Sequence, residues 1–172
     1  MTTANTVHAD RLFIVGSRDG DGWVDCDCGR YHWGLYGAAG LLLVRRDLPE
    51  PHVLLQLRAA WTHGGGTWAL PGGALDSHED PVTAAKREAW EEVGIEEEHL
   101  SVVEIFSDDH GSWGYHTVIA HCHGDANASI ANGESEDLHW VHVDHVHTYE
   151  LHPGFAGSWP HLHPRVIASL QP

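Results

Sequence analysis

Three glutamates in the middle of the chain have the spacing that places their side chains on one side of a helix. Glu88, Glu91 and Glu92 stand at positions i, i+3 and i+4, which are neighbours on a helical surface. Like charges at this spacing destabilise a helix by about 0.2–0.5 kcal/mol per pair. Carboxylate oxygens are also the ligands that Mg²⁺ and Mn²⁺ prefer. The cluster is therefore either a solvated acidic face or a divalent-cation site.

The residues around this cluster favour the cation site. A glycine turn, Pro71-Gly72-Gly73, precedes the helix, and Glu79 stands just ahead of its first turn. Arg87 lies inside the acidic cluster, where a guanidinium can hold a carboxylate by charge-assisted hydrogen bonds. A solvated acidic face requires none of these features.

The segment 73–95, GALDSHEDPVTAAKREAWEEVGI, resembles the Nudix box, G-x5-E-x7-R-E-U-x-E-E-x-G-U, in which U is apolar. Each fixed position is present, and Ala89 is a small residue at the first apolar position. Weaker likeness extends to residues 67–73 and 134–143. Residues 1–36 and the C-terminal tail lie outside the resemblance.

This resemblance implies a fold and a chemistry. The fold is α/β, a Nudix-type α/β/α sandwich with a mixed β-sheet. The activity is hydrolysis of a nucleoside diphosphate linked to another moiety. Carried over by position, Glu88, Glu91, Glu92 and the backbone carbonyl of Gly72 would bind Mg²⁺, for which Mn²⁺ can substitute. The ion would neutralise the diphosphate and lower the pKa of an attacking water.

The resemblance also assigns roles to other acidic residues. Glu79 and Arg87 would pair and brace the loop against the helix. The general base in the family is a box glutamate or one on a later loop, so Glu91 and Glu134 are both candidates. Glu134 lies six residues before Trp140, a spacing similar to that of the loop glutamate in MutT-type members. Its ordinary alternative is a solvated loop charge, and Glu136 and Asp137 are competing carboxylates nearby.

Arginines and aromatic rings are the candidates for substrate binding. Arg45 and Arg58 lie at the ends of predicted strands, where they would reach phosphates. Trp68 and Tyr115 would stack on a base. A solvated arginine and a core aromatic ring are the ordinary alternatives. Further candidates are Arg46, Trp61, Trp113 and Trp140.

We expect a nucleotide substrate, either a (deoxy)nucleoside triphosphate or an oxidised nucleotide, and no sub-signature of the family decides which. The alternative function is a catalytically inactive Nudix-fold module that binds or senses a ligand. Because the box is intact, the sequence favours the enzyme.

A helix over residues 81–93 is predicted to carry the three glutamates. Asp80 is a favourable N-cap, Pro81 suits the first helical position, and Gly94 is a typical C-terminal glycine. Four small or apolar residues form a buried stripe on this helix, Val82, Ala85, Ala89 and Val93. Strands are predicted at 39–46, 52–58, 101–106, 115–121 and 138–143, and a last helix near 164–170. This interleaved order predicts a mixed sheet with helices packed against it.

The length of 172 residues suits a single globular domain. Residues 37–172 are expected to form the Nudix hydrolase domain. Residues 1–36 are expected to be an N-terminal extension with an accessory hairpin, built from an apolar run over 12–15, a turn over 17–22 and the segment from Trp23.

The formal charge of −16 with 17 neutral histidines argues against binding to nucleic acid or anionic membranes. Six of the excess negative charges fall in residues 79–98, at the proposed cation site. No apolar run approaches the roughly 20 residues of a membrane span. The absence of a signal core and the three cysteines favour a cytoplasmic location. The expected partners are a small nucleotide and, because many family members pair, a second copy in a homodimer.

A second cluster near the N-terminus has a less certain chemistry. Cys26, Cys28 and His32 have metal-ligating side chains, but they are spaced more tightly than the usual C-x2–4-C zinc pattern and lack an evident fourth ligand. The sequence leaves open whether they bind a metal. The 17 histidines as a set predict a surface whose charge changes with pH.

Overall fold

The computed structural model describes residues 18–124 and 127–171, and the predicted apolar run over 12–15 lies outside them. The main sheet has seven strands in the order β5-β4-β3-β8-β7, with β6 paired to β3 and β9 paired to β4. Its strands are β3 (Ala38–Arg45), β4 (His52–Arg58), β5 (Trp68–Ala69), β6 (Gly72–Ala74), β7 (Leu100–Asp109), β8 (Gly114–Cys122) and β9 (Ser135–His142). The β3–β8 pair is parallel and the other pairs are antiparallel, so the sheet is mixed, as predicted.

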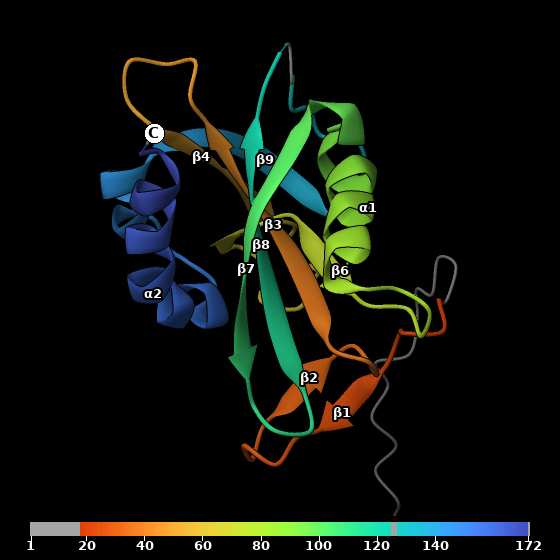
Figure 1. Cartoon of the computed structure of the whole chain (residues 1–172). Helices are drawn as coiled ribbons and strands as arrows, with labels where there is room; N and C mark the ends of the chain where they lie inside the picture. The colour runs from red at the N-terminus through yellow and green to blue at the C-terminus, as the bar shows by residue number, and fades with distance from the viewer. Residues whose placement is uncertain (1–17, 125–126, 172) are drawn as a thin grey trace, which may run out of the picture.

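Two helices cover opposite faces of this sheet, α1 (Pro81–Val93) and α2 (Pro153–Ser169) (Figure 1). The central strand β3 shows why two layers are needed. Leu41 and Leu43 belong to the core cluster beneath α1, whereas Leu42 and Val44 belong to the cluster beneath α2. Because alternate residues of a strand point to opposite faces, a continuously apolar strand must be covered on both sides. The arrangement confirms the predicted α/β/α sandwich.

Helix α1 begins and ends where the sequence predicts. The Asp80 side chain accepts a hydrogen bond from the Thr83 N–H, and Gly94 ends the helix in the left-handed conformation with φ 68°. A residue with a Cβ would be strained at that angle. The helix buries Ala84, Ala85, Ala89, Glu92 and Val93. One buried residue is therefore a carboxylate, which needs polar partners.

Helix α2 corrects the prediction of a short helix near 164–170. It begins at Pro153, and Pro160 and Pro164 both lie inside it. The sequence favours a start at Pro164 because proline suits the first turn and removes a hydrogen-bond donor further along a helix. Tertiary packing outweighs that cost, because the helix buries Phe155, Trp159, Leu162 and Val166 against the sheet. Within the described residues, neither helix is long and apolar enough to cross a membrane.

Strands β1 (Trp23–Asp25) and β2 (Tyr31–Trp33) form a separate hairpin beside the turn that joins β7 to β8 (Figure 1). Hydrogen bonds connect the two segments. The Asp27 N–H donates to Ser112 Oγ at 3.1 Å, and Trp113 Nε1 donates to the Gly34 carbonyl at 3.1 Å. Two 3₁₀ turns, η1 (Glu97–His99) and η2 (Val143–Thr148), complete the described elements.

Candidate active site

The glycine turn and helix α1 are in direct contact. The Gly72 N–H donates to Glu92 Oε2 at 2.9 Å. A Cβ added to Gly73 would lie 2.6 Å from Glu88 Oε1, so a larger residue here would displace the Glu88 carboxylate. The turn and the helix therefore bring together Gly72, Glu88 and Glu92, three of the predicted metal-binding residues.

Glu92 is buried in a polar network that crosses from the helix to the sheet. Gln56 Nε2 donates to Glu92 Oε2 at 3.0 Å, and Ser135 Oγ donates to Gln56 Oε1 at 2.8 Å. Gln56 lies two residues after Leu54, on the α1 face of β4. Gln56 was not among the site residues predicted from the sequence. Gln56 is a single polar residue inside the apolar strand HVLLQLR, and this could have indicated it. It is the polar partner of the one carboxylate that α1 buries.

Burial and repulsion from neighbouring carboxylates raise the pKa values of two of these glutamates. Burial raises the pKa of Glu92 to about 8, and the charge of Glu88 adds to the effect. Burial raises the pKa of Glu88 to about 7, although the Arg87 guanidinium opposes it. A divalent cation would replace the retained protons and offset the repulsion. This crowded set of oxygen donors fits Mg²⁺ or Mn²⁺.

Arg87 connects the helix to the loop ahead of it. Its Nε and Nη2 atoms donate to the two carboxylate oxygens of Glu79, each at 2.7 Å, and Nη2 also reaches the Ala74 carbonyl at 3.0 Å. Its Nη1 atom donates to Glu88. The Glu79 side chain is only 5% exposed and that of Arg87 14%. The bracing pair implied by the resemblance is thus formed, and it is largely shielded from solvent.

The two candidates for the general base lie on the more open side of the cluster. Glu91 is paired with Arg18, and its carboxylate lies 3.7 Å from Arg87 Nη1. Glu134 is exposed, and its charge contributes to the raised pKa values of Glu88 and Glu92.

Glu136, a competing carboxylate, accepts a hydrogen bond from the Ala60 N–H at 3.0 Å. Asp137, the other competitor, lies 3.2 Å from His139 and accepts the Leu138 N–H. Of these three loop carboxylates, Glu134 has the clearest electrostatic link to the cluster.

A cavity of about 320 Å³ is lined in part by Gly72 and Gly73. Its volume falls in the range of about 300–1,000 Å³ that is common for small-molecule sites. The other walls come from the β1–β2 hairpin, the β7–β8 turn and the first turns of α2. Tyr115 lines it from the sheet, and a Cβ on Gly40 would lie 2.2 Å from the Tyr115 hydroxyl. Burial raises the pKa of Tyr115, so the phenol is neutral. Gly72 and Gly73 therefore contact both the cavity and the carboxylate cluster.

The structure separates the predicted substrate-binding residues into two groups. Arg58 and Tyr115 line the cavity, whereas Arg45 and Trp68 do not. Arg45 lies five residues after Gly40 on β3, a distance of about 16 Å along the strand. It binds Asp47 at 2.6 and 2.8 Å. We therefore assign no substrate contact to Arg45 or Trp68.

The secondary candidates divide in the same way. Trp113 lines the cavity. Trp61 is exposed, Trp140 lies beneath Arg45, and Arg46 reaches the Leu170 carbonyl. From the sequence, Trp113 is one of five aromatic candidates, and no pattern separates it from the others. Only the fold brings the β7–β8 turn, which carries Trp113, to the cavity.

Two further cavity residues were missed, His63 and His152. Burial lowers the pKa of both imidazoles, that of His152 to about 4, with the Arg58 charge adding to the effect. Both are therefore neutral at pH 7, and the positive charge at the cavity comes from Arg30 and Arg58. No sequence pattern distinguishes these two from the rest of the 17 histidines.

The raised pKa values of Glu88 and Glu92 predict how the metal-free protein responds to pH. In the unfolded chain, the carboxyl groups of Glu88 and Glu92 lose their protons above a pKa of about 4.3. In the folded protein, Glu92 keeps its proton until about pH 8. The free energy of unfolding should therefore fall as the pH rises from about 5 to about 8. We expect Glu92→Gln to reduce this slope in urea unfolding curves recorded in EDTA. The exposed Glu98→Gln is the control and should keep it. An unchanged slope in Glu92→Gln would contradict the shifted pKa.

Comparisons with known proteins add to this geometry. Residues 35–162 match the family model described as NUDIX domain. A Mycobacterium tuberculosis protein named "Putative 8-oxo-dGTP diphosphatase 3" is 50% identical over 152 residues, which span 84% of this chain and 69% of that protein. A Bifidobacterium longum "Nucleoside triphosphate pyrophosphatase/Nudix hydrolase fusion protein" is 45% identical over 152 residues, which span 86% of this chain and 32% of the fusion. Both matches therefore extend over more than four fifths of this chain.

A solved structure of a Nudix hydrolase has a similar fold. The crystal structure of RenU, a Nudix hydrolase from M. smegmatis, has a TM-score of 0.79 and 45% sequence identity, covering 89% of this chain and 98% of that one. The segment 35–162 that matches the family model contains the glycine turn, helix α1 and Glu134.

Proposed function

Because the chain belongs to the Nudix family of hydrolases, which act on phosphoanhydride bonds, we propose that it hydrolyses 8-oxo-dGTP to the monophosphate and pyrophosphate. The substrate is that named for the M. tuberculosis relative, which is 50% identical. The observation that carries the proposal is the cavity beside Gly72 and Gly73, because the turn that closes one side of it also contacts Glu88 and Glu92. A base held in this cavity would place its phosphates near the carboxylates.

The proposed metal ligands are Glu88, Glu91, Glu92 and the backbone carbonyl of Gly72. When bound, Mg²⁺ or Mn²⁺ would neutralise the diphosphate and lower the pKa of the attacking water. Arg87 holds Glu88 and the loop in register, so its role is positioning. Positioning and charge stabilisation supply most of the rate enhancement in phosphoryl transfer.

The proton of the attacking water would pass to Glu91 or Glu134. Both carboxylates are more open than Glu88 and Glu92, so each is accessible to a water on the solvent side of the cluster. Glu92 is buried, Glu88 is mostly buried, and both are hydrogen-bonded, which suits ligands rather than a base that must exchange protons with solvent.

Cavity residues have proposed roles in binding the nucleotide. Trp113 and Tyr115 present aromatic rings to the cavity, where a purine would stack. Arg58 lies at the cavity with a fixed positive charge and would pair with a phosphate. Its Nε also donates to the His63 carbonyl at 3.0 Å, which holds the side chain in place.

A nucleotide panel with Mg²⁺ tests the proposal. We expect kcat/KM for 8-oxo-dGTP to exceed that for dGTP, dCTP, ADP-ribose and diadenosine tetraphosphate by at least about tenfold, which is about 1.4 kcal/mol of discrimination. Chromatography of the products should show the monophosphate and pyrophosphate. Trp113→Ala should raise KM, whereas the exposed Trp61→Ala should not.

Two other results would contradict the proposal. Preferred turnover of another panel member would move the substrate to that nucleotide. Tight binding without turnover of any member would favour the ligand-binding module.

A further inference from the structure

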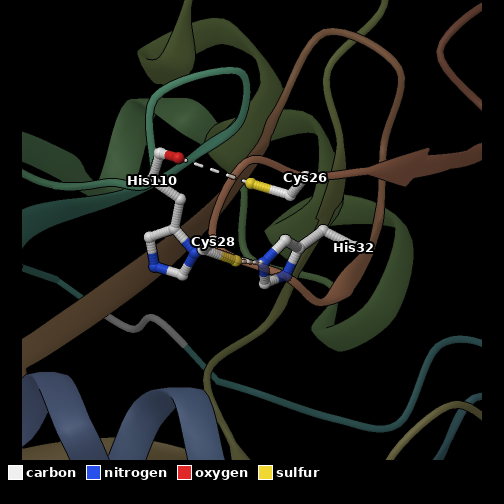
Figure 2. Close-up of side chains that lie close together, drawn as sticks. All are labelled: Cys26, Cys28, His32 and His110. Carbon is white, nitrogen blue, oxygen red and sulfur yellow. Dashed lines mark hydrogen bonds between the residues drawn. The ribbon is translucent and has the colours of Figure 1, made fainter.

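Four metal-ligating side chains outside the carboxylate cluster converge where the β1–β2 hairpin meets the β7–β8 turn. They are Cys26, Cys28, His32 and His110, and one ligand atom from each lies within 4.8 Å of the others. Figure 2 shows them converging from the turn after β1, from β2 and from the turn after β7. His110 is the fourth ligand that the sequence did not reveal. It lies 78 residues from His32 along the chain.

The ligand atoms of these side chains are slightly closer together than the ligands of a bound zinc ion, so a small outward shift would admit the ion. Cys28 Sγ lies 3.1 Å from His32 Nε2, and His32 Nε2 lies 3.0 Å from His110 Nδ1. Around a tetrahedral Zn²⁺ with bonds of about 2.0–2.3 Å, ligand atoms are about 3.3–3.8 Å apart. The Cys26 Sγ, which is 3.4 Å from the His110 carbonyl, completes the cluster. We propose that Cys26, Cys28, His32 and His110 form a tetrahedral zinc site.

The surroundings of the two histidines support this assignment. His110 Nε2 lies 3.3 Å from Asp108 Oδ2. A proton on Nε2 would be shared with this carboxylate, which leaves the lone pair of Nδ1 directed into the cluster. Zinc-bound histidines commonly have such a carboxylate partner. The His32 ring is stacked on Trp113, with centroids 4.1 Å apart and planes 9° from parallel, so its orientation is also fixed.

The chemistry of the ligands separates this site from the carboxylate cluster. Thiolates and imidazoles favour Zn²⁺, whereas the carboxylates of α1 favour Mg²⁺ or Mn²⁺. Four such ligands complete the coordination shell of a structural zinc site. Mg²⁺ in excess would therefore not displace an ion held by Cys26 and Cys28.

The position of the site indicates a structural role. The hairpin has strands of three residues each, and a two-stranded hairpin is marginally stable by itself. Cys26 is 4% exposed, yet the two core clusters are built from other described residues. A zinc ion would join the hairpin to the β7–β8 turn. Because His32 and His110 both line the cavity, it would also fix the outer wall of the cavity.

Metal analysis of protein that carries no histidine tag tests the proposal. We expect about one zinc per chain after dialysis against excess Mg²⁺, and at least a tenfold lower content in Cys26→Ser/Cys28→Ser and in His110→Gln. Two controls should retain the zinc: Cys122→Ala, which removes the cysteine outside the cluster, and Glu88→Gln/Glu92→Gln, which alters the carboxylate cluster. Asp108→Asn should lower the zinc affinity by about 10- to 100-fold.

Two further measurements do not depend on enzymatic activity. The Co²⁺-substituted protein should show visible bands of tetrahedral cobalt and a thiolate-to-cobalt charge-transfer band, and the latter should vanish in Cys26→Ser/Cys28→Ser. Hydrogen exchange over residues 23–33 and 108–113 should accelerate on chelation and recover with Zn²⁺ but not with Mg²⁺.

Three outcomes would overturn the proposal. The first is metal-free wild-type protein with three free thiols that binds neither Zn²⁺ nor Co²⁺. The second is a zinc content unchanged in Cys26→Ser/Cys28→Ser. The third is a Cys26–Cys28 disulfide, detected by mass, in protein prepared under reducing conditions, which would indicate a redox pair.

Discussion

Glu92→Gln and Glu88→Gln are each expected to lower kcat by about 10²–10⁴-fold, because losing a ligand to the catalytic ion removes several kcal/mol of transition-state stabilisation. The fold of Glu92→Gln should persist. A glutamine oxygen can still accept from the Gly72 N–H and from Gln56 Nε2, which now bond to Glu92 Oε2. The variant also removes a carboxyl group whose ionisation is opposed by burial. Steady-state kinetics with Mg²⁺, together with circular dichroism and thermal melting, would measure both effects.

The matched control for these variants is Glu98→Gln, which makes the same chemical change at an exposed position outside the cluster. It should retain wild-type kcat. If Glu88→Gln and Glu92→Gln both hydrolyse every substrate of the parent at near wild-type rates, the metal assignment is wrong. If kcat falls only together with the melting temperature, the loss is due to unfolding.

Arg87→Ala is expected to reduce the free energy of unfolding by about 3–5 kcal/mol, the usual cost of leaving a buried charge without its partner. For a protein of this size, that corresponds to a melting temperature lower by about 6–20 °C. The variant leaves Glu79 and Glu88 without their guanidinium. Arg87→Lys should recover only part of the loss, because an ammonium cannot bind Glu79 with two parallel hydrogen bonds. Calorimetry in EDTA would measure the change without a contribution from Mg²⁺.

Arg45→Ala is the control for Arg87→Ala. Arg45 also binds a carboxylate with two hydrogen bonds, but its partner Asp47 is 54% exposed. An exposed pair contributes at most about 1 kcal/mol. A similar loss in the two variants would show that the bracing pair of α1 has no special structural role.

The parts of the fold that follow local rules were predictable. The bounds of α1 follow from Asp80, Pro81 and Gly94, whose side-chain and backbone properties act within one turn. Strand β4 follows from its apolar run, and the structure gives it the predicted residues, His52–Arg58. The box glutamates also follow from spacing along a single helix.

The parts that depend on contacts between distant segments were not predictable. Helix α2 contains two prolines, and only its packing on the sheet explains why it continues through them. Arg45 and Arg58 both end a strand, but these ends lie at different places relative to Gly72, and a sequence does not tell which end meets the site. His110 joins Cys26, Cys28 and His32 only after β7 and β8 place its turn beside the hairpin.

The outer wall of the cavity has a consequence for engineering and for divergence between relatives. Residues 23–33 and 110–113 contribute no member to either core cluster of the described chain, although Tyr31, Trp33 and Trp113 line the cavity. Substitutions at Tyr31, Trp33 and Trp113 are therefore expected to alter the proposed nucleotide pocket and to leave both core clusters intact. We therefore expect that exchanging the β1–β2 hairpin together with the β7–β8 turn between two relatives would change the substrate selectivity. The proposed hydrolytic centre on α1 would stay the same.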